Sequence, residues 1–229
     1  MKIEILADAN AVADEAAKQV AALARAAVAA RGRFLIAVSG GKTPWKMLRA
    51  LANEEVPWPQ FHVFQVDERI APSGDPDRNL TRLRESLLSH APLPAANIHA
   101  MPVEEKDLEA AAACYAKELE DFAGTPPVLD LAHLGLGPDG HTASLVPNDP
   151  VLEMTDRDVA LTGVYLGRRR MTLTYPVLNR SRNILWLVTG GEKTVMLRRL
   201  QAGDVSIPAG RIRHENALVL ADKAAAVNL

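Results

Sequence analysis

Residues 33–44, RFLIAVSGGKTP, decide the fold of this chain. The stretch begins with a continuous apolar run at 34–38, which is typical of a strand covered on both faces. Two glycines and a proline follow, and proline is tolerated in the first turn of a helix because its missing N–H would be unpaired there anyway. The stretch therefore predicts a buried strand, a glycine loop and a helix in direct succession.

The same alternation extends in both directions from this stretch. Further strands are expected at 2–8, 61–66, 128–137, 170–175, 183–189 and 217–222. Helices are expected at 10–31, capped by Asp8 or Asn10, and then from Pro44 and at 80–90, 104–122 and 192–203. This order predicts an α/β fold: a mostly parallel, doubly wound, Rossmann-like sheet with helices on both faces, in one domain over residues 1–229.

The composition excludes several classes of function. Hydrophobic residues make up 48% of the 229 positions, and the formal net charge of −2 gives no general attraction for nucleic acid. One cysteine, Cys114, excludes an internal disulfide, and its place in a helical segment predicts a buried thiol. No signal peptide or membrane-spanning stretch is recognisable, so we expect a cytoplasmic protein with no membrane partner.

Polar signatures follow four of the predicted strands. They are SGGKTP at 39–44, DER at 67–69, GPDGHTAS at 137–144 and GGEKT at 190–194. In a doubly wound sheet, ligands bind in the crevice beyond the carboxyl ends of the strands. The four signatures are therefore expected to meet around one site.

The loop at 39–43 resembles part of a nucleotide P-loop, but the match is incomplete. The glycine required five residues before Gly41 is Ile36, and Pro44 follows the Lys-Thr pair. What remains is an anion site in which Gly40 and Gly41 present backbone N–H groups. The side chains of Ser39, Lys42 and Thr43 are expected to add further donors, and Lys193 plays the same part in the 190–194 loop.

The residues AVSGG at 37–41 also approach the nucleophile elbow of serine hydrolases. A strand–Ser–helix turn is expected here, although Ala37 replaces the first glycine of that motif. The elbow needs a later histidine as base, and His141, the histidine at a strand end, lies in a glycine turn of its own. Ser39 as a nucleophile is therefore the less favoured interpretation.

The turn at 137–141 carries the sharpest chemical signal. Gly135, Gly137 and Gly140 force a tight backbone around Asp139 and His141, and the residues HTASL that follow are expected to open a helix. A neutral histidine held in this way can take a proton near physiological pH. The plainer alternative is a capping aspartate beside a histidine at a helix start.

Five segments together resemble the 6-phosphogluconolactonase family, within the superfamily that also includes glucosamine-6-phosphate deaminase. They are VSGGKTP (38–44), DER (67–69), LGLGPDGHTASLVP (134–147), RMTLTYPVLN (170–179) and TGGEKTVML (189–197). The resemblance covers about residues 3–220. It implies hydrolysis of 6-phosphoglucono-δ-lactone in the pentose phosphate pathway, without a metal or organic cofactor. We separately expect a monomer or weak homodimer.

Two other functions are set against this one. Related deaminases carry a glutamate five residues after the histidine of the turn, where this chain has Val146, and valine cannot exchange protons. Some transcriptional regulators use a similar fold to sense sugar phosphates, but this chain is expected to begin directly with its first strand, without a helix-turn-helix. The lactonase is therefore the preferred function.

The chemistry of lactone hydrolysis suggests the catalytic roles, and the resemblance adds the phosphate contacts. His141 would be the general base, Asp139 would orient it or fix the turn, and either Arg69 or backbone donors of the turn would stabilise the oxyanion. The expected contacts of the substrate are Arg170 and Lys193 on the 6-phosphate, together with the 39–43 loop, and Gly140 in the turn. Asp67 would either bind sugar hydroxyls or pair with Arg69.

Overall fold

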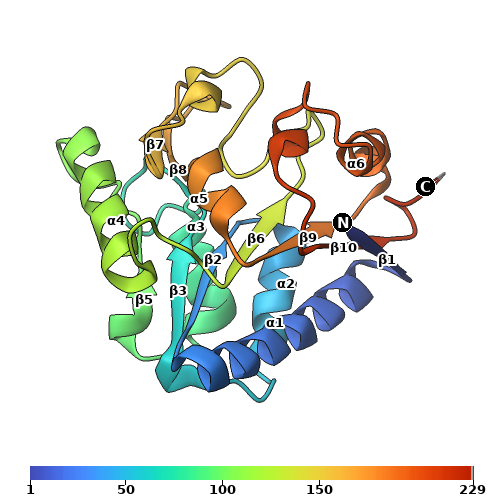
Figure 1. Cartoon of the computed structure of the whole chain (residues 1–229), viewed down its shortest axis with the longest axis horizontal. Helices are drawn as coiled ribbons and strands as arrows, with labels where there is room; N and C mark the ends of the chain where they lie inside the picture. Colours follow the sequence, from blue (N-terminus) through green and yellow to red (C-terminus); the bar gives the residue numbers. More distant parts are fainter. Residues whose placement is uncertain (228) are drawn as a thin grey trace.

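Seven parallel strands form the main sheet of the computed structural model, which describes residues 1–227 and 229 (Figure 1). The spatial order is β1-β10-β9-β6-β2-β3-β5. The strands are β1 (Lys2–Leu6), β2 (Phe34–Val38), β3 (Phe61–Gln65), β5 (Ile98–His99), β6 (Leu131–Gly135), β9 (Asn183–Val188) and β10 (Ala217–Asp222). The prediction of a mostly parallel, doubly wound α/β sheet is confirmed.

Helices cover both faces of this sheet, and each face has its own apolar core. On one face lie α1 (Ala9–Arg31), α2 (Lys42–Leu51) and α3 (Asn79–Leu83); on the other lie α4 (Leu108–Ala123), α5 (Tyr175–Arg180) and α6 (Thr194–Gln201). Along β2, Phe34 and Ile36 enter the first core while Leu35 and Ala37 enter the second. Successive side chains of a strand point to opposite faces, which explains why the strand is apolar throughout.

Side-chain caps determine where the long helices begin. Asp8 caps α1, because its Oδ1 accepts the N–H groups of Asn10 and Ala11 at 2.8 and 2.9 Å.

The expectation of a buried thiol was wrong: Cys114 is exposed. α4 turns Ala111, Tyr115 and other residues of one stripe toward the core, and Cys114 lies outside that stripe.

A second, antiparallel sheet lies beyond the carboxyl end of β3 (Figure 1). Its order is β4-β8-β7, with β4 (Asp67–Arg69), β8 (Arg170–Leu173) and β7 (Val159–Leu161). In the pairing of β4 with β8, Asp67 lies opposite Thr172 and Arg69 opposite Arg170. This sheet therefore brings the DER segment to Arg170, which is about a hundred residues away in sequence.

The expected helix start at HTASL was also wrong. Residues 142–145 form a turn in which Thr142 and Leu145 exchange backbone hydrogen bonds, at 3.4 and 2.9 Å. Ser144 is held elsewhere, because its N–H donates to Thr172 Oγ1 at 3.2 Å and its hydroxyl donates to Asp67 at 2.6 Å. These bonds to the second sheet replace the hydrogen bonds that a helix would make.

None of the helices in the described part of the chain is both long enough and apolar enough to cross a membrane.

Candidate active site

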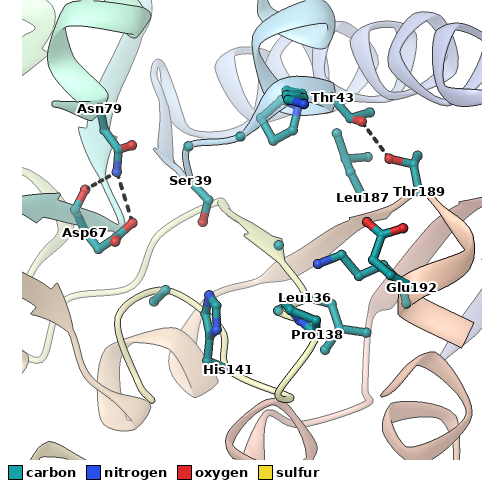
Figure 2. Close-up of a pocket in the computed structure, with 18 of the residues that line it drawn as sticks. Ser39, Thr43, Asp67, Asn79, Leu136, Pro138, His141, Leu187, Thr189 and Glu192 are labelled. Carbon is teal, nitrogen blue, oxygen red and sulfur yellow. Dashed lines mark hydrogen bonds between the residues drawn. The ribbon is translucent and has the colours of Figure 1, made fainter. Parts of the chain in front are cut away.

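A cavity of about 400 Å³ opens at the carboxyl ends of β2, β6 and β9, where the four polar signatures meet (Figure 2). Of the twelve residues given a catalytic or binding role from the sequence, ten line it: Ser39, Gly40, Gly41, Lys42, Thr43, Asp67, Arg69, His141, Arg170 and Lys193. Asp139 and Gly140 do not. Asp139 lies behind His141, and Gly140 is turned toward the 207–210 segment, where its carbonyl accepts the N–H of Ala209 at 2.9 Å.

The 137–141 turn holds His141 against Asp139. Asp139 Oδ1 lies 2.5 Å from Nδ1 of His141 and also accepts the backbone N–H of His141 at 3.2 Å. The turn closes through Gly137 N–H on the His141 carbonyl at 2.8 Å. A side chain at position 137 would come within 2.1 Å of the imidazole, so glycine is required there. The tight turn therefore brings the side chains of Asp139 and His141, which are two residues apart in sequence, into contact.

The charge of Asp139 settles which nitrogen of His141 faces the cavity as an acceptor. The hydrogen bond from His141, reinforced by a bond from Tyr165, keeps the pKa of Asp139 well below its usual range. An ionised carboxylate only accepts hydrogen bonds, so Nδ1 of His141 carries the proton and Nε2 is left with a lone pair. A histidine in this state can accept a proton from water.

The 39–43 loop leaves several donors free. Ser39 Oγ is buried and has no hydrogen-bond partner among the described residues, although Figure 2 shows the side chain facing His141 across the cavity. A nucleophilic serine needs a hydrogen bond to its base, so the elbow interpretation gains no support. The Thr43 hydroxyl bonds that of Thr189 at 2.7 Å and ties the two glycine loops together (Figure 2).

His133, to which the sequence analysis gave no role, supports this loop from below. The side chain is fully buried in β6, and its Nδ1 accepts the backbone N–H of Ser39 at 3.2 Å. Burial lowers the pKa of His133 to about 4, so the imidazole is neutral and able to accept. A lone histidine in an apolar strand carries no sequence signal for this contact.

Two cations reach the cavity from half-buried or buried positions. Burial lowers the pKa of Arg170 and of Lys193, which means that the charged form of each side chain is destabilised by partial loss of its hydration. The Nε atom of Arg170 is buried without a hydrogen-bond partner in the described part of the chain, and the one contact of its Nη1 is Ser144 Oγ at 3.4 Å. A bound anion would restore the interactions that both groups lack.

Asn79, which the sequence analysis missed, organises the DER side of the cavity. Its amide nitrogen donates to the Asp67 backbone carbonyl and carboxylate at 2.9 and 3.2 Å, as Figure 2 shows. Its Oδ1 accepts from Arg69 at 2.7 Å. Asp67 thus accepts hydrogen bonds from Asn79 and Ser144. In the described part of the chain it forms no ion pair with Arg69. Buried Glu68 caps α3 by accepting the N–H of Asn79 at 2.8 Å.

Other cavity residues also escaped notice in the sequence. Thr189 and Glu192 were within quoted segments but received no role, and both line the cavity.

Within the described residues, no group of three or more His, Cys, Asp or Glu side chains is arranged to hold a metal ion.

Comparison with known proteins agrees with this arrangement. Residues 7–220 match the family model described as glucosamine-6-phosphate isomerases/6-phosphogluconolactonase. A 6-phosphogluconolactonase of Synechocystis is 41% identical over 211 residues, covering 89% of this chain and 88% of that one. One from Mycobacterium tuberculosis is 38% identical over 241 residues, covering 99% and 98%.

Among solved structures, a 6-phosphogluconolactonase from Thermotoga maritima superposes with a TM-score of 0.85 at 29% identity, over 96% of this chain and 98% of that one. The fold, the positions of the motifs and the extent of these matches lead to one conclusion. The chain belongs to the glucosamine-6-phosphate isomerase/6-phosphogluconolactonase family.

Proposed function

We propose that this chain is a 6-phosphogluconolactonase, which hydrolyses 6-phospho-D-glucono-1,5-lactone to 6-phospho-D-gluconate in the pentose phosphate pathway. The observation that carries the proposal is the cavity itself, where one carboxylate-paired imidazole faces a ring of unsatisfied donors and cations. We further propose that residues 1–229 act as one cytoplasmic domain, monomeric or weakly dimeric, without a metal or organic cofactor.

His141 supplies the proton transfers of the reaction. Nε2 takes a proton from a water molecule as the water oxygen bonds to the lactone carbonyl carbon, and negative charge develops on the carbonyl oxygen. The tetrahedral intermediate then collapses, the bond from this carbon to the ring oxygen breaks, and imidazolium returns the proton to that oxygen. The products are a carboxylic acid, which ionises, and a free hydroxyl group.

Arg69 is the better candidate for stabilising the oxyanion. Backbone donors of the 137–141 turn were the alternative, but the N–H groups of Gly137, Gly140 and His141 are already bonded within the turn. Arg69 lines the cavity, and its buried Nε has no partner among the described residues. A cation at that position would stabilise the developing negative charge more strongly than it would in water.

Arg170 and Lys193 hold the 6-phosphate together with the 39–43 loop. An arginine fork can contact phosphate through two N–H groups, while lysine acts as a point charge. Gly40 and Gly41 add backbone N–H groups at the start of α2, where the helix dipole also favours an anion. Asp67 is assigned to the sugar side of the substrate, whereas Gly140, which does not line the cavity, shapes the turn instead of binding the substrate.

Deamination of glucosamine 6-phosphate is the alternative that the shared family keeps open. The position of the deaminase glutamate is Val146, which is buried and does not line the cavity. The carboxylates that line it are Asp67 and Glu192, and Asp67 is already bonded by Ser144 and Asn79. Valine at position 146 cannot exchange protons as the glutamate of the deaminases would, so the lactonase is favoured.

The test is hydrolysis of freshly prepared 6-phosphogluconolactone against a no-enzyme control, since the lactone also opens spontaneously. Glucosamine 6-phosphate is assayed in parallel for ammonia, and both assays are repeated after prolonged treatment with EDTA. We expect lactone hydrolysis that survives EDTA and no ammonia release. Ammonia at a rate comparable to hydrolysis would overturn the assignment, and activity lost to EDTA and restored by one metal would overturn the cofactor-free mechanism.

A further inference from the structure

The loop between β7 and β8 turns a single aromatic side chain, Tyr165, toward the site. Its neighbours Val164 and Leu166 are 71% and 80% exposed, whereas Tyr165 is partly buried. Tyr165 and Arg168 exchange backbone hydrogen bonds at 2.9 and 3.3 Å, and the two residues between them, Leu166 and Gly167, have φ values of 50° and 81°. This is the geometry of a tight two-residue hairpin turn, so Tyr165 has a fixed backbone position.

The tip of this hairpin is also held from outside. Arg168 donates to Asp75 at 3.0 Å and to Asp77 at 3.2 Å, both in the segment that precedes α3. Such partly exposed ion pairs stabilise the fold only weakly, but two carboxylates on one guanidinium restrict where the tip can lie. The loop therefore presents Tyr165 to the His141–Asp139 pair from a defined direction.

Tyr165 contacts both members of the His141–Asp139 pair and a proposed phosphate ligand. Its hydroxyl donates to Asp139 Oδ2 at 3.0 Å, the carboxylate oxygen opposite the one that faces His141. Its ring meets the imidazole edge-on, with 5.5 Å between centroids and 67° between planes. The Arg170 guanidinium lies 5.0 Å from the ring centroid on its face.

We propose that Tyr165 is a positioning residue for the general base, acting through Asp139. Its hydrogen bond holds Oδ2, so that Oδ1 stays aimed at Nδ1 of His141 and the imidazole keeps Nε2 toward the cavity. The same bond draws negative charge away from the carboxylate, which weakens the attraction of Asp139 for an imidazolium. Tyr165 therefore fixes the orientation of His141 through Asp139. This proposal rests on the lactonase function proposed above.

The variant that isolates the hydroxyl is Tyr165→Phe, because phenylalanine keeps the ring contacts with His141 and Arg170. We expect kcat to fall about tenfold, in line with the loss of a hydrogen bond to a charged group, while KM stays within about twofold. The acid limb of the pH profile of kcat should move to higher pH. Leu166→Ala, at the exposed neighbouring position, is the matched control and should change neither quantity.

Two measurements separate positioning from a general effect on the fold. In an Asp139→Ala background, Tyr165→Phe should cause no further loss of kcat, because the side-chain oxygens through which it acts are gone. An NMR titration of the His141 ring protons, assigned with a His141→Asn variant, should show protonation at higher pH in Tyr165→Phe than in the parent. The NMR titration needs no substrate, so it reports on the contact independently of lactone hydrolysis.

The outcomes distinguish the two proposals. A parent protein without lactonase activity overturns the proposed function, and the NMR titration then still decides whether Tyr165 tunes His141. An active parent in which Tyr165→Phe leaves kcat, the acid limb and the titration unchanged overturns the role of Tyr165. An equal loss of kcat with and without Asp139 would also overturn it, because the hydroxyl would then not act through that carboxylate.

Discussion

The 137–141 turn and the 39–43 loop face the same cavity but use their backbone donors in opposite ways. In the turn, the N–H groups of Gly137, Gly140 and His141 are all bonded internally. In the loop, the N–H groups of Gly40 and Gly41 have no partner among residues 1–227 and 229. A group that moves protons needs a fixed position, whereas an anion site needs donors that are free until the ligand arrives. The hydrogen bonds of the two segments thus separate the catalytic role from the binding role.

The largest expected effect comes from exchanging the two regions' polar side chains for alanine. His141→Ala removes the proton acceptor, so kcat should fall by roughly 10²–10⁴-fold with little change in KM. Ser39→Ala should keep most of kcat, because Ser39 is assigned to binding. Steady-state kinetics on the lactone measure both. If Ser39→Ala abolishes turnover while His141→Ala does not, and mass spectrometry traps an acyl-enzyme, the roles given to the two regions must be reversed.

A milder test inserts one methyl group into each region. In Gly137→Ala the new Cβ would lie 2.1 Å from His141 Nδ1 and 2.6 Å from Asp139, so the imidazole must move, and kcat should fall on the order of 100-fold. In Gly40→Ala the new Cβ would instead lie 2.1 Å from the amide oxygen of Asn79. We expect this variant mainly to raise KM. Equal kcat losses in the two variants would contradict the separation of roles.

Next in size is the loss of a proposed phosphate ligand. Arg170→Ala and Lys193→Ala remove charge from a part of the substrate that does not react, so KM should rise roughly 10- to 100-fold, with a smaller change in kcat. Arg169→Ala and Arg198→Ala, both at exposed positions, are the matched controls. Gluconolactone without the phosphate should be a poor substrate for the parent. Parent-like KM values in both ligand variants would remove the phosphate from this side of the cavity.

The smallest effect on activity is expected for His133 beneath the 39–43 loop. Changes at this residue should instead alter how the stability of the protein depends on pH. The pKa of His133 is about 4 in the folded chain, against an ordinary value of 6.5, so the unfolded chain takes up the proton first as pH falls. The contribution of neutral His133 to the free energy of unfolding is therefore complete above pH 6.5. It is lost as pH falls from 6.5 to 4, by up to about 3 kcal/mol.

His133→Asn offers an amide oxygen to the Ser39 N–H but cannot titrate. Urea unfolding at a series of pH values should give a shallower loss of stability for this variant between pH 6.5 and 4. His90→Asn, at an exposed position, should keep the slope of the parent. A parent-like slope in His133→Asn would assign the acid sensitivity to another group, of which partly buried His62, with a pKa lowered to about 4 mainly by burial, is the first to examine.

Much of the fold and part of the site followed from local features of the sequence. The apolar run of β2 and the glycine-proline punctuation after it identified a strand, a loop and a helix, because hydrophobic periodicity and backbone freedom act over a few residues. Parallel strands share one carboxyl edge, so the meeting of four polar signatures around one cavity was also predictable. The contact of Asp139 with His141 belongs here too, since both lie in a single turn.

Only the tertiary structure decided how the distant segments complete this site. The pairing of Asp67 with Thr172 brings Arg170 in from a separate sheet, and the bonds of Ser144 to that sheet prevent the helix expected at 141–145. Tyr165 reaches Asp139, and His133 reaches Ser39, across separations of 26 and 94 residues. Such contacts depend on strand register and on the packing of whole elements, which no local pattern of residues encodes.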